Sequence, residues 1–217
     1  MIRRLDLPDA PSPAGAGVLE APAAARNLDP IRRVLVPNLP RQGRVLELAA
    51  GTGQHVAAWA AHRPDLTFLP TEPDADRRAS IDARCAGLSN VAPATALDAC
   101  RPGWSAALDA PVEAILLVNL LHLISDAEMA VLLDEATQAL APGGLFAIYG
   151  PFLRGHAPVS DGDRAFDARL RAQDPAIGYK DRDVVVATLD VLGLTVRAIE
   201  MPANNLMLLA RSHGALR

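Results

Sequence analysis

Residues 47–55 read Glu-Leu-Ala-Ala-Gly-Thr-Gly-Gln-His, and they indicate the fold of this chain more strongly than any other segment. They end an apolar run at 44–50 that is typical of a buried strand, and they lead into a helical pattern at 54–61. The glycines allow the backbone to turn tightly and to approach a ligand closely. Free N–H groups at the start of the following helix favour a polar or anionic ligand. We therefore predict a ligand-binding turn between a strand and a helix.

Three details separate this turn from other nucleotide-binding turns. A dinucleotide-binding turn requires a third glycine where this chain has Val56, which argues against a nicotinamide-dependent oxidoreductase. No Lys-Ser or Lys-Thr pair follows the turn, so the phosphate-binding loop of nucleotide hydrolases is absent. Glu47 closes the strand before the turn, and its carboxylate would repel a pyrophosphate but attract an ammonium group. The turn thus favours a ligand that carries a positive charge.

Strand and helix patterns alternate along the chain. The predicted strands occupy residues 44–50, 66–71, 90–97, 112–119, 145–150, 194–200 and 206–211. The predicted helices occupy residues 29–39, 54–61, 74–86, 126–140, 164–171 and 181–192. This alternation predicts an α/β fold in which helices cover both faces of a mostly parallel sheet. No helix separates the last two strands, so we expect the last strand to run antiparallel.

Acidic side chains stand at the ends of the first three predicted strands. They are Glu47, Glu72 and Asp98. Ligands of open α/β sheets bind at the carboxyl ends of the strands, so we expect these carboxylates in one crevice. The spacing of Glu72 suits a carboxylate that accepts hydrogen bonds from ribose hydroxyls, and Asp98 could accept one from an adenine amino group. Together the acids predict a site for a cationic nucleoside.

The composition limits the partners and the compartment that we expect. A formal net charge of -4 and the absence of a basic run disfavour a nucleic-acid partner. Cys85 and Cys100 form neither a metal-binding nor a disulfide pattern. No apolar signal stretch follows the first arginines, and the apolar run at 114–124 is too short to span a bilayer. We therefore expect a cytoplasmic protein without a membrane segment.

The domain organisation follows from the distribution of proline, glycine and alanine. Residues 8–25 are rich in these three, which predicts a flexible N-terminal segment at 1–25 that can serve as a lid. The remaining residues, 26–217, are expected to form a single domain because no second core or internal repeat is visible.

Motifs spread along the chain carry a family resemblance. Besides the turn, they are Arg26-Asn27, Pro30-Ile31, Asn119 to His122, Tyr149-Gly150-Pro151-Phe152, Phe166-Asp167, Asp174-Pro175, Asp181 and Met201-Pro202-Ala203-Asn204-Asn205. Over roughly residues 24–211 the chain resembles a family of class I methyltransferases that use S-adenosylmethionine (SAM), namely the domain-of-unknown-function family that includes methyltransferase-like protein 26. The resemblance implies a Rossmann-like, seven-stranded sheet in the order 3-2-1-4-5-7-6. The chain departs from the pattern at Asp163, Lys180 and Ala49, where Asn, Arg and, in many methyltransferases, Gly are usual.

The resemblance and the strand-end argument together give the expected site residues. For SAM binding they are Glu47, Ala49, Gly51, Thr52, Gly53, His55, Glu72, Asp98 and Asn119. For catalysis they are His122, as a general base, and Tyr149, as a hydrogen-bonding group for the acceptor. For the substrate they are Arg26, Asn27, Phe152, Asn204 and Asn205. The histidines lack metal-ligand spacing, so we expect no metal.

Several of these residues also have purely structural interpretations. His122 could be a hydrogen-bonded structural histidine, Phe152 a core residue, and Asn204 with Asn205 a simple turn. Arg26 and Asn27 could merely cap the first helix instead of forming part of a lid. These interpretations stay open at the level of the sequence.

The features together predict transfer of a methyl group from SAM to a small-molecule thiol, hydroxyl or amine. Residues 119–122 lack the Pro-Pro-aromatic motif of methyltransferases that act on amino groups of bases and glutamine, which disfavours those substrates. A thiolate would need little base catalysis, whereas a hydroxyl would need His122 or a similar group. The alternative is a non-catalytic module that binds SAM or a partner protein.

Overall fold

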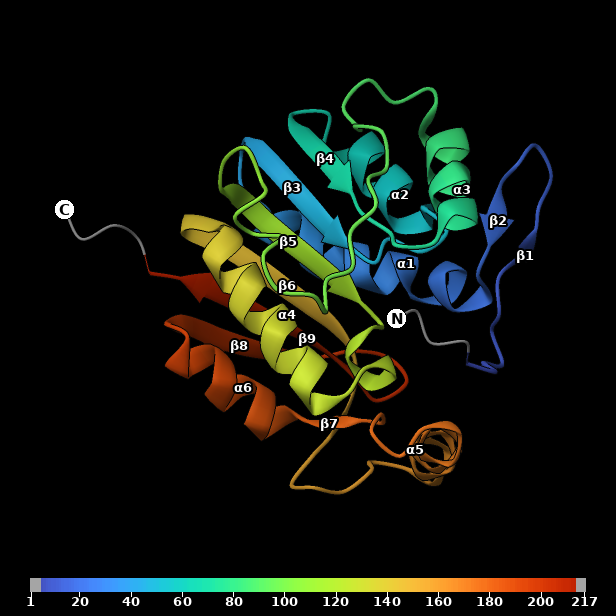
Figure 1. Cartoon of the computed structure of the whole chain (residues 1–217), viewed down its shortest axis with the longest axis vertical. Coiled ribbons are helices and arrows are strands. Elements are labelled where there is room, and N and C mark those ends of the chain that lie inside the picture. The colour runs from blue at the N-terminus through green and yellow to red at the C-terminus, as the bar shows by residue number, and fades with distance from the viewer. Residues whose placement is uncertain (1–4, 214–217) are drawn as a thin grey trace.

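The computed structural model describes residues 5–213, which form one large sheet with helices on both faces (Figure 1). The strand order is β4 (Leu66–Pro70), β3 (Gly43–Leu48), β5 (Val112–Val118), β6 (Leu140–Leu153), β9 (Asn205–Ser212) and β8 (Leu194–Glu200). β9 pairs antiparallel with both of its neighbours, whereas β4, β3, β5 and β6 pair in parallel. The predicted α/β class, the order of these six strands and the reversed last strand are confirmed. Residues 1–4 of the predicted N-terminal segment and residues 214–217 of the predicted domain lie outside the described range.

The prediction of a regular third strand at residues 90–97 is wrong. This segment runs beside β4 but forms two isolated parallel bridges instead of a ladder. Pro70 on β4 and Pro93 on the segment have no N–H to donate, which interrupts a continuous ladder. The seventh strand of the sheet is instead β7 (Lys180–Asp181), which pairs in parallel with the end of β6.

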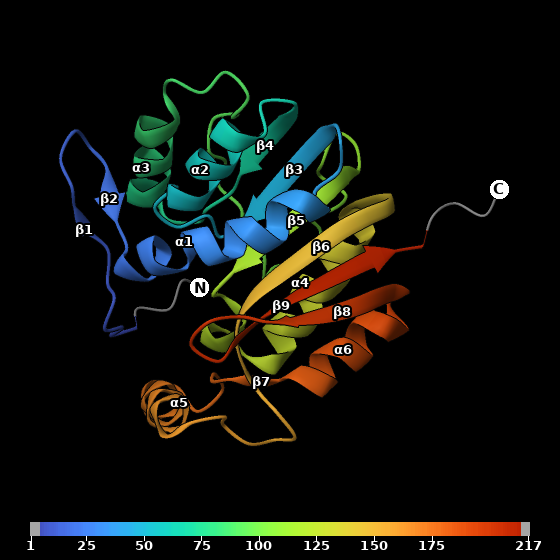
Figure 2. The same ribbon diagram turned by 180° about the vertical axis from the view of Figure 1, so that it is seen from behind.

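Helices cover the two faces of the sheet unequally. One face carries α1 (Pro22–Leu35), α2 (Gln54–His62) and α3 (Ala75–Cys85), and α1 crosses in front of the sheet in the view from behind (Figure 2). The other face carries α4 (Asp126–Ala139) and α6 (Arg182–Val191). Each face therefore has its own apolar core, and the sheet separates the two.

The first helix begins earlier than predicted, at Pro22 instead of at residue 29. Proline suits the first helical position because its missing N–H would have no helical partner there, and the alanines that follow favour a helix. The helix ends at Leu35 and continues as the 3-10 turn η1 (Val36–Asn38). Ile31 and Leu35 face the core.

The segment before α1 contains a small antiparallel ribbon of β1 (Ser12–Pro13) and β2 (Leu19–Glu20). The ribbon lies beside α3 (Figure 1). The N–H of Leu19 donates to Ser80 Oγ at 2.8 Å, and Arg84 donates to the Leu19 carbonyl oxygen at 2.7 Å. The N-terminal segment is thus tied to the same side of the sheet as the glycine turn.

The connection from β5 to β6 bears on the site. The 3-10 turn η2 (Leu121–Leu123) follows β5, and Ser125 then caps α4 in a capping box with Glu128. The helix ends at Ala139 and the chain enters β6 directly. Residues 142–144, between the predicted helix and the predicted strand at 145–150, therefore lie in the irregular start of β6.

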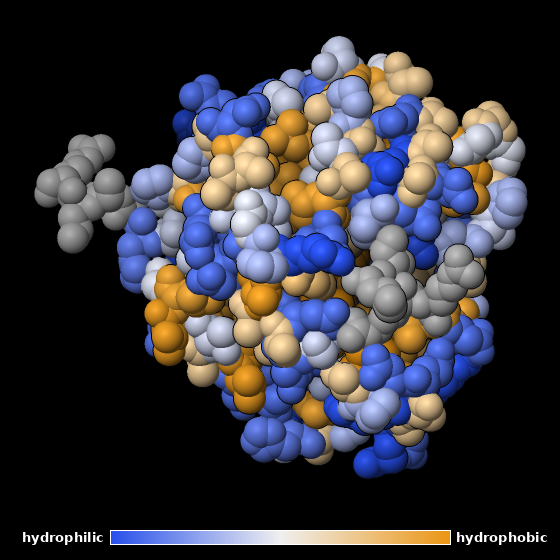
Figure 3. Space-filling model, in the orientation of Figure 1, coloured by the Kyte–Doolittle hydropathy of each residue, from blue (hydrophilic) through white to orange (hydrophobic). Residues whose placement is uncertain are grey.

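Helix α5 (Asp161–Gln173) stands beyond the end of β6, away from both faces of the sheet (Figure 1). Its Leu170 packs with Ile177 and Tyr179 in a small third core. On the surface, the face seen in Figure 3 mixes hydrophilic and hydrophobic residues. Within residues 5–213, no helix combines the length and the apolar character needed to cross a membrane.

The two glycines of the turn give a matched stability test. Gly53 has φ +80°, and an added Cβ would lie 2.9 Å from the Ile81 Cα on α3. Gly51 has φ +59°, with nothing within 4 Å of the added Cβ. We expect Gly51→Ala to cost about 1 kcal/mol, from the left-handed backbone alone. Gly53→Ala is expected to cost about 2–4 kcal/mol because a clash is added. Urea unfolding measures both, and equal losses would contradict this account of the turn.

Candidate functional site

A cavity of about 700 Å³ opens at the carboxyl ends of β3, β4 and β5. Carboxylates contribute most of its charge; they are Asp9, Glu47, Glu72, Asp74, Asp98 and Glu128. Arg77 is the single Lys or Arg in the lining, as far as residues 5–213 form it. The cavity is therefore strongly acidic at the edge where the fold places its ligand.

The glycine turn forms the floor of this cavity. Ala49, Gly51 and Thr52 line it, as predicted, whereas Gly53 does not. Ala49 and Gly51 have φ angles of 51° and 59°, so the chain turns through the left-handed region at both. The carbonyl oxygen of Thr52 accepts hydrogen bonds from Ser80 Oγ (3.1 Å) and Arg84 Nε (3.2 Å). Helix α3 thus fixes the turn, and Gly53 serves the close contact with that helix.

Glu47 is a buried carboxylate in the cavity wall. Its side chain is 2% exposed, and its Oε2 atom has no hydrogen-bond partner among residues 5–213. Burial and then the nearby Glu72 carboxylate raise the pKa of Glu47 well above its ordinary value. A cation bound beside Glu47 would favour its ionised form and could also pair with the free oxygen.

Glu72 joins the turn to the end of β4. Its Oε2 accepts the N–H of Gly51 at 2.9 Å, and its Oε1 accepts the N–H of Asp74 at 3.2 Å. Arg77 lies 4.0 Å from Oε1. Burial outweighs these favourable contacts and raises the pKa of Glu72. Each carboxylate oxygen accepts more than one hydrogen bond, so Glu72 retains the capacity to accept from a ligand.

Asp98 lines the cavity, as predicted, at the far end of the segment that replaces the third strand. Its Oδ1 accepts the N–H of Cys100 at 3.1 Å, and its Oδ2 lies 3.4 Å from Arg101 Nε. Trp104 is buried, and its Nε1 donates to the Ala99 carbonyl oxygen at 3.2 Å. Trp104 therefore anchors the loop and is not part of the lining.

Asn119 occupies the cavity edge just after β5. Its φ angle is 55°, which is uncommon for a residue with a side chain, and its N–H donates to the Tyr149 carbonyl oxygen at 2.8 Å. The backbone is thus turned at this point while β5 and β6 are still hydrogen-bonded. Non-glycine residues in this conformation concentrate at ligand sites.

His55 and Asn27 form a hydrogen-bonded pair behind the glycine turn. His55 lines the cavity, and its Nε2 lies 2.8 Å from Asn27 Oδ1. The His55 ring also stacks on Trp59, with ring centroids 5.1 Å apart. Burial lowers the pKa of His55 to about 4, so the ring is neutral at pH 7. Asn27, expected at the substrate, thus reaches the cavity indirectly by orienting His55.

Arg26 is also connected to the cavity indirectly, through Asp9. Its guanidinium forms an ion pair with Asp9, which lines the cavity, while Arg26 itself is largely exposed and outside the lining. The pairing fixes the N-terminal segment to α1. We expected Arg26 to belong to a lid over the site, and the structure joins it to the segment that crosses the cavity edge.

The structure does not bring His122 and Tyr149 to the cavity lining, although both were predicted for catalysis. His122 is buried, and its ring faces Phe166 and Tyr179 with centroids 5.9 and 6.0 Å away. Burial, followed by Lys180, lowers the pKa of His122 to about 4. Tyr149 packs in the core beneath α1 and α2, and burial raises its pKa to about 12. The sequence correctly predicted that both residues lie at the carboxyl edge of the sheet, but their side chains do not line the cavity.

Phe152, Asn204 and Asn205 also lie outside the lining. Phe152 belongs to the core beneath α4 and α6. Asn204 has φ 58°, and its Nδ2 donates to Asp163 Oδ2 at 3.0 Å. Asn205 Nδ2 donates to the Pro202 carbonyl oxygen at 3.0 Å. These contacts match the structural interpretations, namely core packing and a turn.

Other lining residues were missed by the sequence argument. Asp74 caps α3 by accepting the N–H of Arg77 at 2.9 Å, and both residues line the cavity. Their position just after Glu72 was the available signal. Leu5, Leu7 and Asp9 reach the cavity from the N-terminal segment, where the sequence has no periodic pattern that would place them.

The sheet order, the glycine turn and the cavity at the strand ends define the fold of class I SAM-dependent methyltransferases. The chain belongs to the family described as protein of unknown function DUF938, whose profile matches residues 19–212.

Solved structures with this fold resemble the chain closely in shape and distantly in sequence. An O-methyltransferase family protein from Burkholderia thailandensis has a TM-score of 0.74 and 17% identity, with coverage of 89% of this chain and 58% of that one. Human N-acetylserotonin methyltransferase in complex with SAM has a TM-score of 0.69 and 13% identity, covering 88% and 53%. The CurJ carbon methyltransferase has a TM-score of 0.68 and 18% identity, covering 88% and 56%. The chain thus spans a little over half the length of each of these structures.

The buried Glu47 carboxylate predicts an unusual pH dependence of stability. Because its pKa in the folded protein lies above the ordinary value of 4.5, the unfolded chain loses this proton first as the pH rises. The free energy of unfolding should therefore fall as the pH rises above the ordinary pKa of 4.5, until Glu47 ionises in the folded protein as well. Glu47→Gln should flatten this fall in urea titrations of the ligand-free protein.

Glu200→Gln is the matched control because Glu200 is exposed and forms its ion pair with Arg154, far from the buried carboxylates. It should follow the wild-type profile. A Glu47→Gln profile that also parallels the wild type would show that Glu47 is ionised at little cost in the folded protein.

Proposed function

We propose that this protein is a SAM-dependent methyltransferase that acts on a small-molecule acceptor. The observation that carries the proposal is the Glu47 carboxylate, which is buried and lacks a partner for Oε2 among residues 5–213, in an acid-lined cavity at the carboxyl edge of the sheet. SAM carries an ammonium and a sulfonium against a single carboxylate, so its net positive charge matches this electrostatic environment. The resemblance of residues 47–55 to the family that includes methyltransferase-like protein 26 supports the same assignment.

We assign the lining residues along the sheet edge to successive parts of SAM. Glu47, beside the glycine turn, would accept from the ammonium group of the methionine moiety. Glu72 would accept from the ribose hydroxyls, and Asp98 from the adenine amino group. Thr52 and the turn around Gly51 would bring backbone close to the cofactor. This assignment uses those predicted cofactor residues that line the cavity. Asn119, just after β5, would lie at the end of the cavity that receives the acceptor.

The chemistry is a displacement at carbon. When bound, SAM supplies an electrophilic methyl carbon and a neutral thioether as leaving group. A lone pair of the acceptor forms the new bond to that carbon as the carbon–sulfur bond breaks, and the bonding electrons pass to sulfur. An acceptor that carries a proton on the attacking atom releases it to a base or to water. The protein contributes mainly by holding the acceptor in line, which supplies a large part of such rate enhancements.

The acceptor atom is proposed to be sulfur, oxygen or nitrogen of a small molecule. Solved structures with this fold include proteins named as O-methyltransferases and one named as a carbon methyltransferase, so the fold accommodates acceptors of different chemistry. A thiol or an amine needs the least help from a base. A hydroxyl would need one, and His55 places a neutral imidazole in the lining.

The proposal is tested by binding and by turnover. Isothermal calorimetry should show binding of SAM and of S-adenosylhomocysteine, the demethylated product. Glu72→Ala should weaken both by about ten- to a hundredfold because hydrogen bonds to a buried carboxylate are lost. Glu200→Gln, at an exposed residue outside the lining, should bind like the wild type.

Turnover is then measured as S-adenosylhomocysteine formed with a panel of small thiols, phenols, carboxylates and amines. Product with at least one class is expected. Binding of SAM without turnover of any class would support the alternative, a non-catalytic SAM-binding module. Stabilisation by NADH but not by SAM or S-adenosylhomocysteine would overturn the proposal.

Substitution of His122 distinguishes a catalytic role of this residue from a structural one. We propose that it supports the wall formed by its neighbours Leu120 and Leu123, because the lining includes those two residues but not His122. His122→Asn should lower the free energy of unfolding by about 1–3 kcal/mol and leave turnover per folded molecule within about threefold. Asn119→Ala, at the lining, should instead lower turnover, with a cost in stability of about 1 kcal/mol from the left-handed backbone. A loss of more than about a hundredfold in kcat for folded His122→Asn would restore the predicted general base.

A further inference from the structure

The cofactor side of the cavity contains two buried carboxylates whose surroundings differ. Glu47 and Glu72 are 2% and 3% exposed. Glu72 accepts the N–H groups of Gly51 and Asp74. Arg77 lies 4.0 Å from Glu72 Oε1. Oε2 of Glu47, in contrast, has no hydrogen-bond partner within residues 5–213, so the surroundings support a negative charge on Glu72 better than on Glu47.

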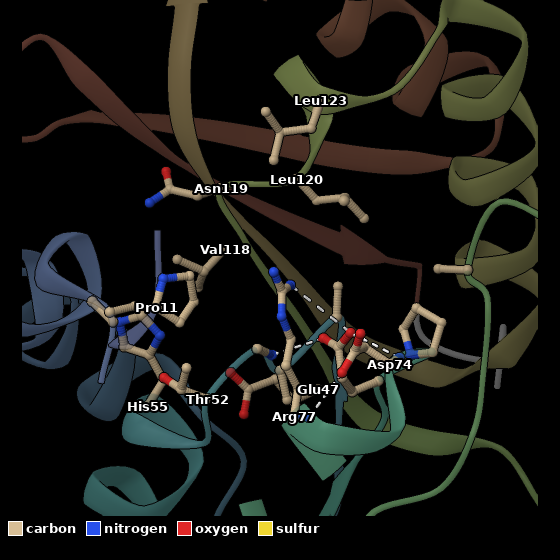
Figure 4. A pocket seen from close by; sticks show the side chains of 18 of the residues that line it. Pro11, Glu47, Thr52, His55, Asp74, Arg77, Val118, Asn119, Leu120 and Leu123 are labelled. Carbon is tan, nitrogen blue, oxygen red and sulfur yellow. Dashed lines mark hydrogen bonds and ion pairs between the residues drawn. The ribbon is translucent and has the colours of Figure 1, made fainter. Parts of the chain in front are cut away.

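The ionisable groups around Glu47 come from three elements. They are Glu72 and Asp74 in the segment after β4, Arg77 and Cys85 on α3, and His55 on α2. Arg77 shares one side of the cavity with Glu47 and Asp74 (Figure 4), but it forms its ion pair with Glu72. His55 is neutral at pH 7, and α1 and β5 line the cavity with alanines and a valine. A charged Glu47 would therefore face a second carboxylate, and burial together with Glu72 raises its pKa.

An ammonium group beside Glu47 would reverse this preference. A carboxyl group that keeps its proton is neutral, so its burial costs far less than that of a carboxylate. Once an ammonium group lies within hydrogen-bond distance, the carboxylate gains an opposite charge and a donor for its free oxygen. The proposed function places the amino group of the methionine moiety at this position. The ligand would thus bring the cation that the described residues do not supply there.

We propose that Glu47 holds a proton in the ligand-free protein and exchanges it for the ammonium group of the cofactor. The O–H bond of the carboxyl group breaks, its electron pair stays on the oxygen, and the proton passes to the solvent. This inference rests on the proposed function, since it concerns the cofactor of the same site. Glu47 thereby selects adenosyl ligands that carry an amino group, and the affinity for such ligands rises with pH.

Calorimetry measures the exchanged proton directly. The full chain is titrated with S-adenosylhomocysteine at about pH 6.5, where the amino group of the ligand is protonated in solution. Phosphate and ACES buffers are compared, because they differ strongly in their enthalpy of ionisation. The dependence of the heat on the buffer should show release of about half to one proton per bound ligand. The affinity should correspondingly rise about three- to tenfold for each pH unit near this pH.

Two further ligands identify the group that displaces the proton. 5′-Methylthioadenosine keeps the adenosine and the sulfur but lacks the amino acid end, so it should release fewer than about 0.1 protons. Decarboxylated S-adenosylhomocysteine keeps the amine and lacks the carboxylate, so it should release as many protons as S-adenosylhomocysteine. The comparison separates the ammonium group from the rest of the ligand.

A variant then identifies the residue that gives up the proton. Glu47→Gln keeps the size of the side chain but cannot titrate, so S-adenosylhomocysteine should bind to it with almost no release of protons. Glu200→Gln is the matched control, because Glu200 is an exposed carboxylate outside the lining and should leave the release unchanged. Far-ultraviolet circular dichroism confirms that both variants are folded. The comparison of ligands on the wild-type protein tests the exchange even where Glu47→Gln binds too weakly for calorimetry.

The outcomes distinguish this inference from the proposed function. If S-adenosylhomocysteine binds without release of a proton, or if Glu47→Gln releases as many protons as the wild type, the exchange at Glu47 is wrong while the cofactor site stands. If 5′-methylthioadenosine releases as many protons as S-adenosylhomocysteine, the ammonium group is not what displaces the proton, and the inference is likewise overturned. If S-adenosylhomocysteine itself does not bind, the proposed function falls and the proton exchange falls with it.

Discussion

The hydrogen bond from the Gly51 N–H to the Glu72 carboxylate, 2.9 Å long, holds the site together. It fastens the turn after β3 to the end of β4, next to the backbone bonds from Ala50 N–H to Thr71 O and from Thr71 N–H to Glu47 O, both 2.9 Å. The cost of this arrangement is two carboxylates buried close together, which raises the pKa of Glu47. Together with the hydrogen bonds from α3 to the Thr52 carbonyl oxygen, this contact fixes the turn that forms the cavity floor.

Much of the cofactor side could be predicted from sequence because it follows from the backbone. The carboxyl ends of parallel strands meet at one edge, so Glu47, Glu72 and Asp98 had to lie near one another once the strands were recognised. Asn119 follows β5 and reaches the same edge for the same reason. The reversal of β9 follows from the missing helix before it, and the order of the six regular strands is what the family resemblance implies; both are confirmed.

The acceptor side could not be predicted in this way, because it depends on side-chain direction and on long-range contacts. His122 and Tyr149 stand at the correct edge, but each turns into a core. Leu5 and Leu7 meet Leu123 only through the folded N-terminal segment, and no periodicity marks them. The strand expected at 90–97 failed because Pro70 and Pro93 lack the N–H groups that a ladder requires.

The stack of His55 on Trp59 gives the protein an optical signal of its own. The chain has two tryptophans, and Trp59 is fully buried, with no hydrogen-bond partner for its indole nitrogen among residues 5–213. The imidazole that covers it is also part of the cavity surface. Any molecule that shifts or recharges His55 changes the surroundings of the indole, so the emission of Trp59 reports occupancy of the site without an added label.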